Sequence, residues 1–237
     1  MALSTTDVTL WYDLEEGTGN TLDNAEGTSS RDGTNSGAVW TTGGPTNISK
    51  ALDFDGSNFD RILLNNTLTD LSLTSFSVSM WLKLDNASSN QYLWNDWGGS
   101  PNRSVYLRQL SNKMEFYISD NGTSSELQLD PALTNTSTYV HVVLTRDGND
   151  TELIFNGSSV DTNTGSFTLP ASATDLVFGC NPAGDDSPFD GKLAQLAILN
   201  KALTTTEAGE IYNSGDGITY NNLFNPGVVF IPKVMIF

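Results

Sequence analysis

Residues 189–212 read FDGKLAQLAILNKALTTTEAGEIY and decide the fold. The run KLAQLAIL alternates and is largely apolar, so it predicts a well-buried strand. Thr204 and Glu207 then form a capping box, in which the Thr204 hydroxyl accepts from the Glu207 N–H and the Glu207 carboxylate accepts from the Thr204 N–H. This signal predicts a short helix over residues 205–212, with Gly215 as its left-handed stop.

The same segment, with Phe189-x-Gly191 before the strand and an Asn-x-Ala-Leu-Thr run before the helix, resembles the closing segment of laminin-G-like domains of the concanavalin A-like lectin/glucanase superfamily. Further family motifs follow in order: ALDFDG, FSVSMWLKL, YVHVVLTRDG, LIFNG and LVFG. The resemblance implies an all-β fold, an antiparallel two-sheet β-sandwich of jelly-roll type with a short C-terminal helix. It also implies that the first strand, near residues 8–14, pairs with the last.

The local patterns are those of such a sandwich. Alternation in residues 76–84 places five apolar side chains on one face, which we expect to line the core: Phe76, Val78, Met80, Leu82 and Leu84. Asn156-Gly157 between apolar runs predicts a type I′ hairpin. The length of 237 residues suits one large β domain. We expect the sandwich over residues 1–215, with a linker and an apolar C-terminal tail over residues 216–237.

Composition limits the partners. The formal charge of −17 argues against nucleic acid or an anionic membrane, because phosphate binding needs a basic surface. No apolar run reaches the ~18 residues of a membrane span. Cys180 is the single cysteine and predicts a buried thiol. The N-terminus has no signal-peptide pattern, so we expect a soluble chain made in the cytoplasm, or a processed product.

A catalytic site is not expected. Related glucanases carry a Glu-x-Asp-x-x-Glu strand that delivers two carboxylates to one bond, and this sequence has no such strand. His141 is the only histidine and matches a family strand position, where it is expected to be structural. We therefore predict a protein that is not an enzyme.

Sugar binding on β-sandwiches uses aromatic rings with polar side chains nearby. The best candidates lie around the Gly98-Gly99 loop: Trp94, Asp96, Trp97, Asn102, Arg103 and Tyr106. Alternation puts Trp94 and Trp97 on opposite faces, so at most one of them is a platform. The alternative is that these rings fill the core. The loop at residues 181–186, NPAGDD, is a second, separate candidate.

The resemblance also implies a calcium ion in the long loop of residues 15–44. Asp23 and Asp32 match loop positions of the family, but the acidic residue expected after Gly191 is missing. Asp190 is the adjacent substitute. Calcium takes six to eight oxygens, and a loop held by Asx-turns is the alternative. Both remain open at this stage.

The C-terminal residues are too apolar to be left in water and too few to span a membrane. The candidate assembly residues are Val228, Val229, Phe230, Ile231, Val234, Ile236 and Phe237. The tail either folds back on its own sandwich or joins another subunit, giving a homo-oligomer or a contact with capsid or virion proteins. Two functions follow as hypotheses. One is a structural protein on a large assembly, such as a phage virion surface component. The other is a free lectin-like glycan-binding module reaching the extracellular space by another route, with a glycan hydrolase as a distant third.

Overall fold

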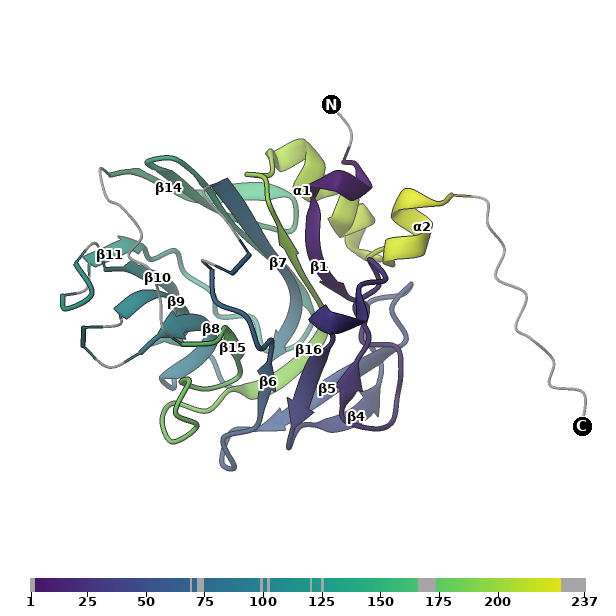
Figure 1. Cartoon of the computed structure of the whole chain (residues 1–237), viewed down its shortest axis with the longest axis horizontal. Helices are drawn as coiled ribbons and strands as arrows, with labels where there is room; N and C mark the ends of the chain where they lie inside the picture. The colour runs from purple at the N-terminus through teal and green to yellow at the C-terminus, as the bar shows by residue number, and fades with distance from the viewer. Residues whose placement is uncertain are drawn as a thin grey trace, which may run out of the picture.

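The computed structural model describes residues 3–68, 70–71, 75–98, 100–101, 103–119, 121–124, 126–165 and 174–226. These residues form two antiparallel sheets packed face to face, with two short helices on one side (Figure 1). The predicted two-sheet antiparallel β-sandwich with a short C-terminal helix is therefore confirmed.

Sheet A and sheet B each contain eight strands within the described part of the chain. In spatial order, sheet A contains β14 (Ser158–Thr164), β13 (Asp150–Phe155), β12 (Val140–Asp147), β7 (Ser75–Leu84), β16 (Asp190–Leu199), β5 (Lys50–Asp55) and β4 (Val39–Thr42), with β1 (Val8–Tyr12) also paired to β16. Sheet B contains β11 (Glu126–Leu129), β10 (Lys113–Ile118), β9 (Arg103–Leu110), β8 (Gln91–Trp97), β15 (Val177–Phe178), β6 (Arg61–Leu63), β3 (Gly33–Ser36) and β2 (Thr21–Leu22). Short 3₁₀ turns lie at η1 (Thr5–Asp7), η2 (Ser29–Arg31) and η3 (Asn213–Gly215).

Strand β16 is the centre of sheet A. It pairs with β7 along its length, with β5 over its first half and with β1 over its second half. In the β1 pairing, Val8 lies opposite Leu199 and Tyr12 lies opposite Leu196. The predicted pairing of the first strand with the last is confirmed, and it joins residues almost two hundred positions apart in one ladder.

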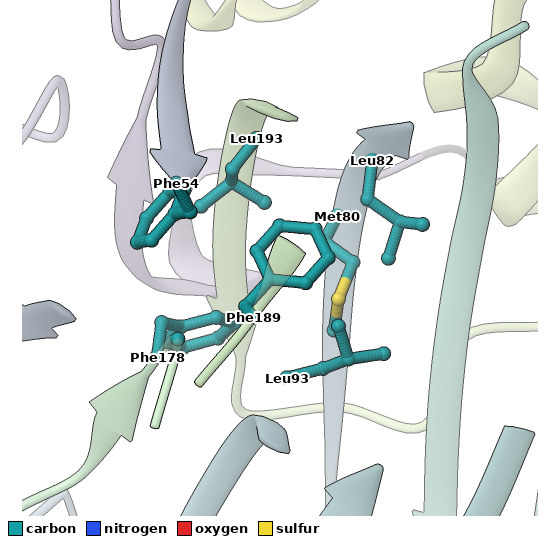
Figure 2. Close-up of a pocket in the computed structure, with 8 residues that line it drawn as sticks. Phe54, Met80, Leu82, Leu93, Phe178, Phe189 and Leu193 are labelled. Carbon is teal, nitrogen blue, oxygen red and sulfur yellow. The ribbon is translucent and has the colours of Figure 1, made fainter. Parts of the chain in front are cut away.

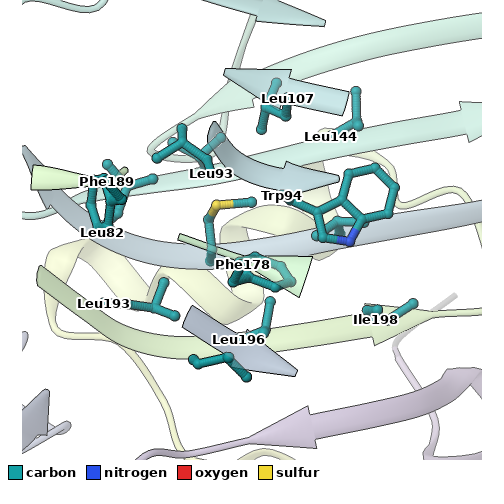
Figure 3. Close-up of a cluster of buried hydrophobic side chains, with 14 of the residues drawn as sticks. Leu82, Leu93, Trp94, Leu107, Leu144, Phe178, Phe189, Leu193, Leu196 and Ile198 are labelled. Carbon is teal, nitrogen blue, oxygen red and sulfur yellow. The ribbon is translucent and has the colours of Figure 1, made fainter. Parts of the chain in front are cut away.

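The core lies between the sheets and is apolar. Trp94 and Phe178 from sheet B meet Leu144, Leu196 and Ile198 from sheet A (Figure 3). The core face predicted for residues 76–84 is confirmed, since its five apolar side chains are at most 1% exposed. Each such side chain contributes about 1.5–3 kcal/mol when it leaves water, which makes this layer the main source of stability.

A small void remains inside this core. Its walls are apolar and include Phe54, Met80, Phe178 and Phe189, and its volume is about 10 Å³ (Figure 2). A water molecule needs roughly that much space and also two or more polar partners, which this lining does not offer. The void is therefore a packing defect and not a ligand site.

Helix α1 (Thr205–Tyr212) begins at the predicted capping box. Glu207 N donates to Thr204 Oγ1 at 3.3 Å, and Thr204 N donates to Glu207 Oε2 at 3.0 Å. The prediction that Gly215 stops the helix is wrong. Asn213, with φ of 47°, takes the left-handed position directly after the helix, because asparagine tolerates this conformation well.

A second helix, α2 (Tyr220–Phe224), follows in the segment assigned to a linker. Its Tyr220 and Phe224 rings lie edge-on to Trp11, with centroids 5.9 and 6.0 Å away. Asp13 accepts a hydrogen bond from Tyr220 N at 3.0 Å, which holds the first turn of the helix. The described part of residues 216–226 thus packs on the sandwich.

No helix in the described ranges is long and apolar enough to cross a membrane. The seven assembly candidates between Val228 and Phe237 lie outside the described residues.

Candidate functional site

The first site candidates divide between the two faces of β8. A β-bulge lies where Tyr92 pairs with Arg108 but Trp94 pairs with Leu107. Trp94 points into the core and is 0% exposed, whereas Trp97 reaches the outer face and is partly exposed. The two tryptophans lie on opposite faces, as alternation indicates, and Trp97 is the one available to a ligand.

Asp96 points inward and is buried. Its carboxylate accepts from the Thr174 hydroxyl at 3.1 Å, which connects β8 to the chain before β15. Asp96 therefore lies beneath the outer face of β8 and is not exposed to a ligand there. Asn102 lies outside the described residues.

A surface groove with a volume of about 500 Å³ lies over this end of sheet B. We call it the sheet B groove. Its lining comes from β8 and β9 on one side and from the chain around β15 on the other: Tyr92, Trp97, Gly98, Arg103, Thr174, Asn181, Pro182, Ala183 and Asp186. The two candidates that are separate in the sequence, around Trp97 and at residues 181–186, form one site.

The pairing of β8 with β15 brings these segments together. Phe178 lies opposite Trp94 in an antiparallel pairing, so the loop after β15 runs beside Leu93 and Tyr92 at the beginning of β8. Tyr92 N donates to Ser187 O at 2.9 Å, and Asn95 Nδ2 donates to Cys180 O at 2.6 Å. Backbone and side-chain bonds on both sides of the loop therefore fix its position against the strand.

The loop itself is braced by Asn181. Its Oδ1 accepts from Asp185 N at 2.9 Å and from Asp186 N at 3.0 Å. Gly184, with φ of 74°, lies against the Arg61 guanidinium, and a Cβ there would be only 1.5 Å from Arg61 Nη1. The positive φ is what favours glycine at this position, since the end of the Arg61 side chain can move aside. The result is a preformed wall for the groove.

Opposite charges face each other across the groove. The Arg103 guanidinium lies 5.6 Å from the Trp97 ring centroid, and its Nη1 donates to Thr123 O. Asp186 lies on the other wall and accepts from the Ser187 hydroxyl at 2.9 Å. Burial, followed by the negative charge of Asp186, raises the pKa of Tyr92, so its hydroxyl stays protonated and available as a hydrogen-bond donor.

Tyr106 is only 6% exposed and lies under the groove. Its ring centroid is 4.7 Å from Trp97 and 5.3 Å from Tyr92, with both contacts edge-to-face. It therefore positions the exposed rings. Tyr92 was missed as a site residue in the sequence, because strict alternation puts it on the same face as Trp94 and only the bulge between them turns it outward.

A second surface groove of about 440 Å³ lies over β12–β14 of sheet A. Its lining is polar and acidic, including Asp147, Asp150 and Glu152, and it has no aromatic ring. Ala202 and Leu203 are its apolar residues, and it lacks an aromatic ring on which a sugar could stack.

The proposed calcium residues come together only in part, because Asp23 and Asp32 adjoin the paired residues Leu22 and Gly33 while Asp190 lies elsewhere. Asp23 and Asp32 flank the short strands β2 and β3 of sheet B, whereas Asp190 begins β16 of sheet A. Asp32 Oδ1 already accepts from Asn24 N at 3.0 Å. In the described ranges, no three His, Cys, Asp or Glu side chains form a group that could hold a metal ion. Asp23 and Asp32 together supply fewer side-chain oxygens than the six to eight that a calcium ion takes.

His141 lies on the outer face of sheet A and is fully buried. Its Nε2 is 2.8 Å from Ser79 Oγ, and its ring lies against Trp81 at 5.1 Å and Tyr212 at 6.2 Å. Burial lowers the pKa of His141 to about 3. A substrate cannot reach this Ser–His pair, which is a structural contact beneath α1.

Comparisons with known proteins agree with this architecture. A family model described as concanavalin A-like lectin/glucanases superfamily matches residues 55–209. No curated protein sequence matches the chain significantly.

Among solved structures, the binding domain of Paraclostridial Mosquitocidal Protein 1 is similar with a TM-score of 0.67 and 15% identity, over 89% of this chain and 52% of that one. A structure of botulinum neurotoxin type C is similar with a TM-score of 0.63 and 16% identity, over 89% of this chain and 51% of that one. This chain thus spans about half the length of these toxin chains. A third similar structure is domain 4 of AbnA, a GH43 extracellular arabinanase from Geobacillus stearothermophilus. Its TM-score is 0.59 and its identity 18%, over 86% of this chain and 97% of that domain.

At these identities the similar structures establish the fold alone. Several of them are described as binding domains of those proteins. The family match covers well over half of the 237 residues. The chain therefore belongs to the concanavalin A-like lectin/glucanases superfamily.

Proposed function

We propose that this protein is a carbohydrate-binding module that takes a glycan in the sheet B groove without catalysis. The observation that carries the proposal is the convergence of Trp97 and Tyr92 with Arg103, Asn181 and Asp186 on one open, preformed site. Rings accept the C–H face of a pyranose or furanose, and the amide, guanidinium and carboxylate bind its hydroxyls.

The mixed charge of the groove favours a neutral, polyhydroxylated ligand. Arg103 donates only, Asp186 accepts only, and the Tyr92 hydroxyl can do both. A neutral sugar can satisfy all three, whereas an anionic sugar would be repelled by Asp186 and a cationic one by Arg103.

The similar structures support the ligand class. Domain 4 of AbnA is described in complex with arabinotriose, and cell entry of botulinum neurotoxin type C is described as dependent on two ganglioside molecules. These properties belong to those proteins. They support carbohydrate binding here as a use to which this fold is well suited.

The test is a panel of immobilised neutral and sialylated glycans, including arabinotriose, probed with the full-length protein and followed by calorimetry on the best ligand. Trp97→Ala is expected to lower affinity at least tenfold, about 1.4 kcal/mol. The control is Val160→Ala, an exposed residue of β14 on the other sheet. Absence of binding across the panel, or equal loss in both variants, overturns the proposal.

A second candidate function is display on a large assembly, such as a virion surface, with attachment through the C-terminal segment. The supporting observation is the position of α2, which lies on the opposite side of the molecule from β8–β11 (Figure 1). Attachment there leaves the groove free. The test is the solution mass of the full-length chain beside one ending at Pro226, which keeps α2. A defined oligomer that becomes a monomer on truncation supports it, and two monomers count against it.

A further inference from the structure

The outer face of sheet B continues beyond the groove as a row of side chains that crosses four strands. The strand registers place Asn95 of β8 opposite Tyr106 of β9, Tyr106 opposite Tyr117 of β10, and Tyr117 opposite Leu127 of β11. We call these four residues the cross-strand row. The row begins beside Trp97 and runs away from the loop at residues 181–186.

The outer half of the row, Tyr117 and Leu127, reaches the surface, whereas Asn95 and Tyr106 are buried at 0% and 6% exposure. Leu127 is 44% exposed, and among the described residues only Val39 and Val160 are other exposed large apolar side chains. Tyr117 is partly exposed and stacks on Tyr106, with ring centroids 4.7 Å apart and planes 19° from parallel. Leu127 therefore continues the partly exposed Tyr117 ring as an apolar strip over β10 and β11, and it is not an isolated residue.

The row is also held rigid. The Arg108 guanidinium lies 5.6 Å from the Tyr106 ring centroid and 5.1 Å from that of Tyr117. Glu115 fixes this arginine, accepting from Nε at 2.8 Å and lying 2.7 Å from Nη2. Rings that are already ordered lose little entropy when a ligand covers them, which is the property of a preorganised binding surface.

The cross-strand row is longer than one sugar ring. Neighbouring strands lie about 4.8 Å apart, so the path from β8 to β11 covers about 14 Å. That distance exceeds one sugar ring and is comparable with a short oligosaccharide. The groove, with its volume of about 500 Å³, lies at the β8 end of this path.

We infer that the ligand is a stretch of an extended glycan chain, with one unit in the sheet B groove and further units along Tyr117 and Leu127. This inference rests on the proposed function and adds the ligand's form: a chain crossing the strands, not a single terminal sugar. Trp97 and Asp186 hold the unit in the groove. Contacts of the further units with the cross-strand row make the affinity depend on chain length.

The experiment measures affinity against chain length by calorimetry on the full-length protein, with arabino-, xylo-, gluco- and manno-oligosaccharides of one to six units. For the series that binds, affinity is expected to rise at least tenfold from one unit to three or four and then level off. Leu127→Gln and Tyr117→Ala should each remove at least threefold of that gain and leave the single sugar unchanged.

Val160→Ala, an equally exposed apolar residue on the other sheet, serves as the matched control and should alter nothing. Melting temperatures establish that each variant is folded. If Tyr117→Ala is not folded, Leu127→Gln alone still tests the inference. If affinity does not depend on chain length but is lost in Trp97→Ala, the inference of an extended chain is overturned, while the proposed binding in the sheet B groove still holds. No binding of any sugar at any length overturns the proposed function as well.

Discussion

The outer faces of the two sheets carry similar aromatic residues and serve different ends. On sheet A, Trp81 stacks on Tyr212 of α1 at 5.6 Å, and Trp11 lies under Tyr220 of α2. Both tryptophans are at most 1% exposed. On sheet B, Trp97 and its neighbours have no helix over them in the described ranges (Figure 1). The uncovered aromatic face of sheet B is the one that we propose binds a ligand.

The sharpest way to break this comparison is to remove one tryptophan from each face. Trp81→Ala should lower the free energy of unfolding by about 3–5 kcal/mol, because a buried ring leaves a cavity. Trp97→Ala should lower it by no more than about 1 kcal/mol, since its ring is partly solvated. Urea titration of both variants, followed by tryptophan fluorescence, measures the difference. Equal losses would contradict the distinction between a covered and an uncovered face.

Removing the cover from sheet A is the next largest change. A chain ending at Gly217 lacks α2 and uncovers Trp11, and we expect a loss of about 2–4 kcal/mol from the buried area of Tyr220 and Phe224. A chain ending at Pro226 keeps the helix and should unfold like the full-length chain. Differential scanning calorimetry of the three chains decides the point. If the two truncations melt together, α2 does not stabilise the sandwich.

Acidification tests the covered face through His141. Its pKa is lowered to about 3 in the folded state, so between pH 6.5 and 3 the unfolded chain binds the proton and the folded one does not. Stability is therefore lost as pH falls below 6.5, by about 1.4 kcal/mol per unit, or about 2 kcal/mol at pH 5.

The matched comparison for this prediction is His141→Gln, whose amide can replace Nε2 toward Ser79 without titrating. Carboxylates such as Asp13, whose pKa is raised mainly by burial, titrate in both proteins and cancel in the difference. Urea titrations at pH 7 and pH 5 should show the smaller loss for the variant. The same slope in both proteins would show that His141 is not the titrating group.

Calcium is expected to have the smallest effect. Since Asp190 begins a strand of the other sheet and does not join Asp23 and Asp32, millimolar calcium should leave the melting temperature unchanged relative to an EDTA control. Stabilisation that saturates with calcium and is lost in Asp32→Asn would show that the long loop does hold the ion.

What the sequence predicts well is local. The core face of residues 76–84 follows from a two-residue period, and α1 follows from Thr204 and Glu207, which are three residues apart. Family order then arranges these elements into a sandwich.

What the sequence does not predict depends on residues far apart along the chain. The bulge after Tyr92 sets which way the neighbouring side chains point, and it exists only in the pairing with β9. The groove needs β15 beside β8, some eighty residues along the chain. Helix α2 is short and carries two asparagines, so its sequence alone does not predict a helix. Its contacts with Trp11 and Asp13, near the opposite end of the sequence, stabilise it.

The most direct test of the central claim follows the five tryptophan indole N–H signals in a ¹H–¹⁵N spectrum during titration with the oligosaccharide that binds best. Trp97→Phe assigns its own signal. We predict that the Trp97 signal shifts and saturates while the Trp11, Trp81 and Trp94 signals stay in place. Shifts of the Trp11 or Trp81 signals with Trp97 unmoved would place the ligand on sheet A and contradict the account.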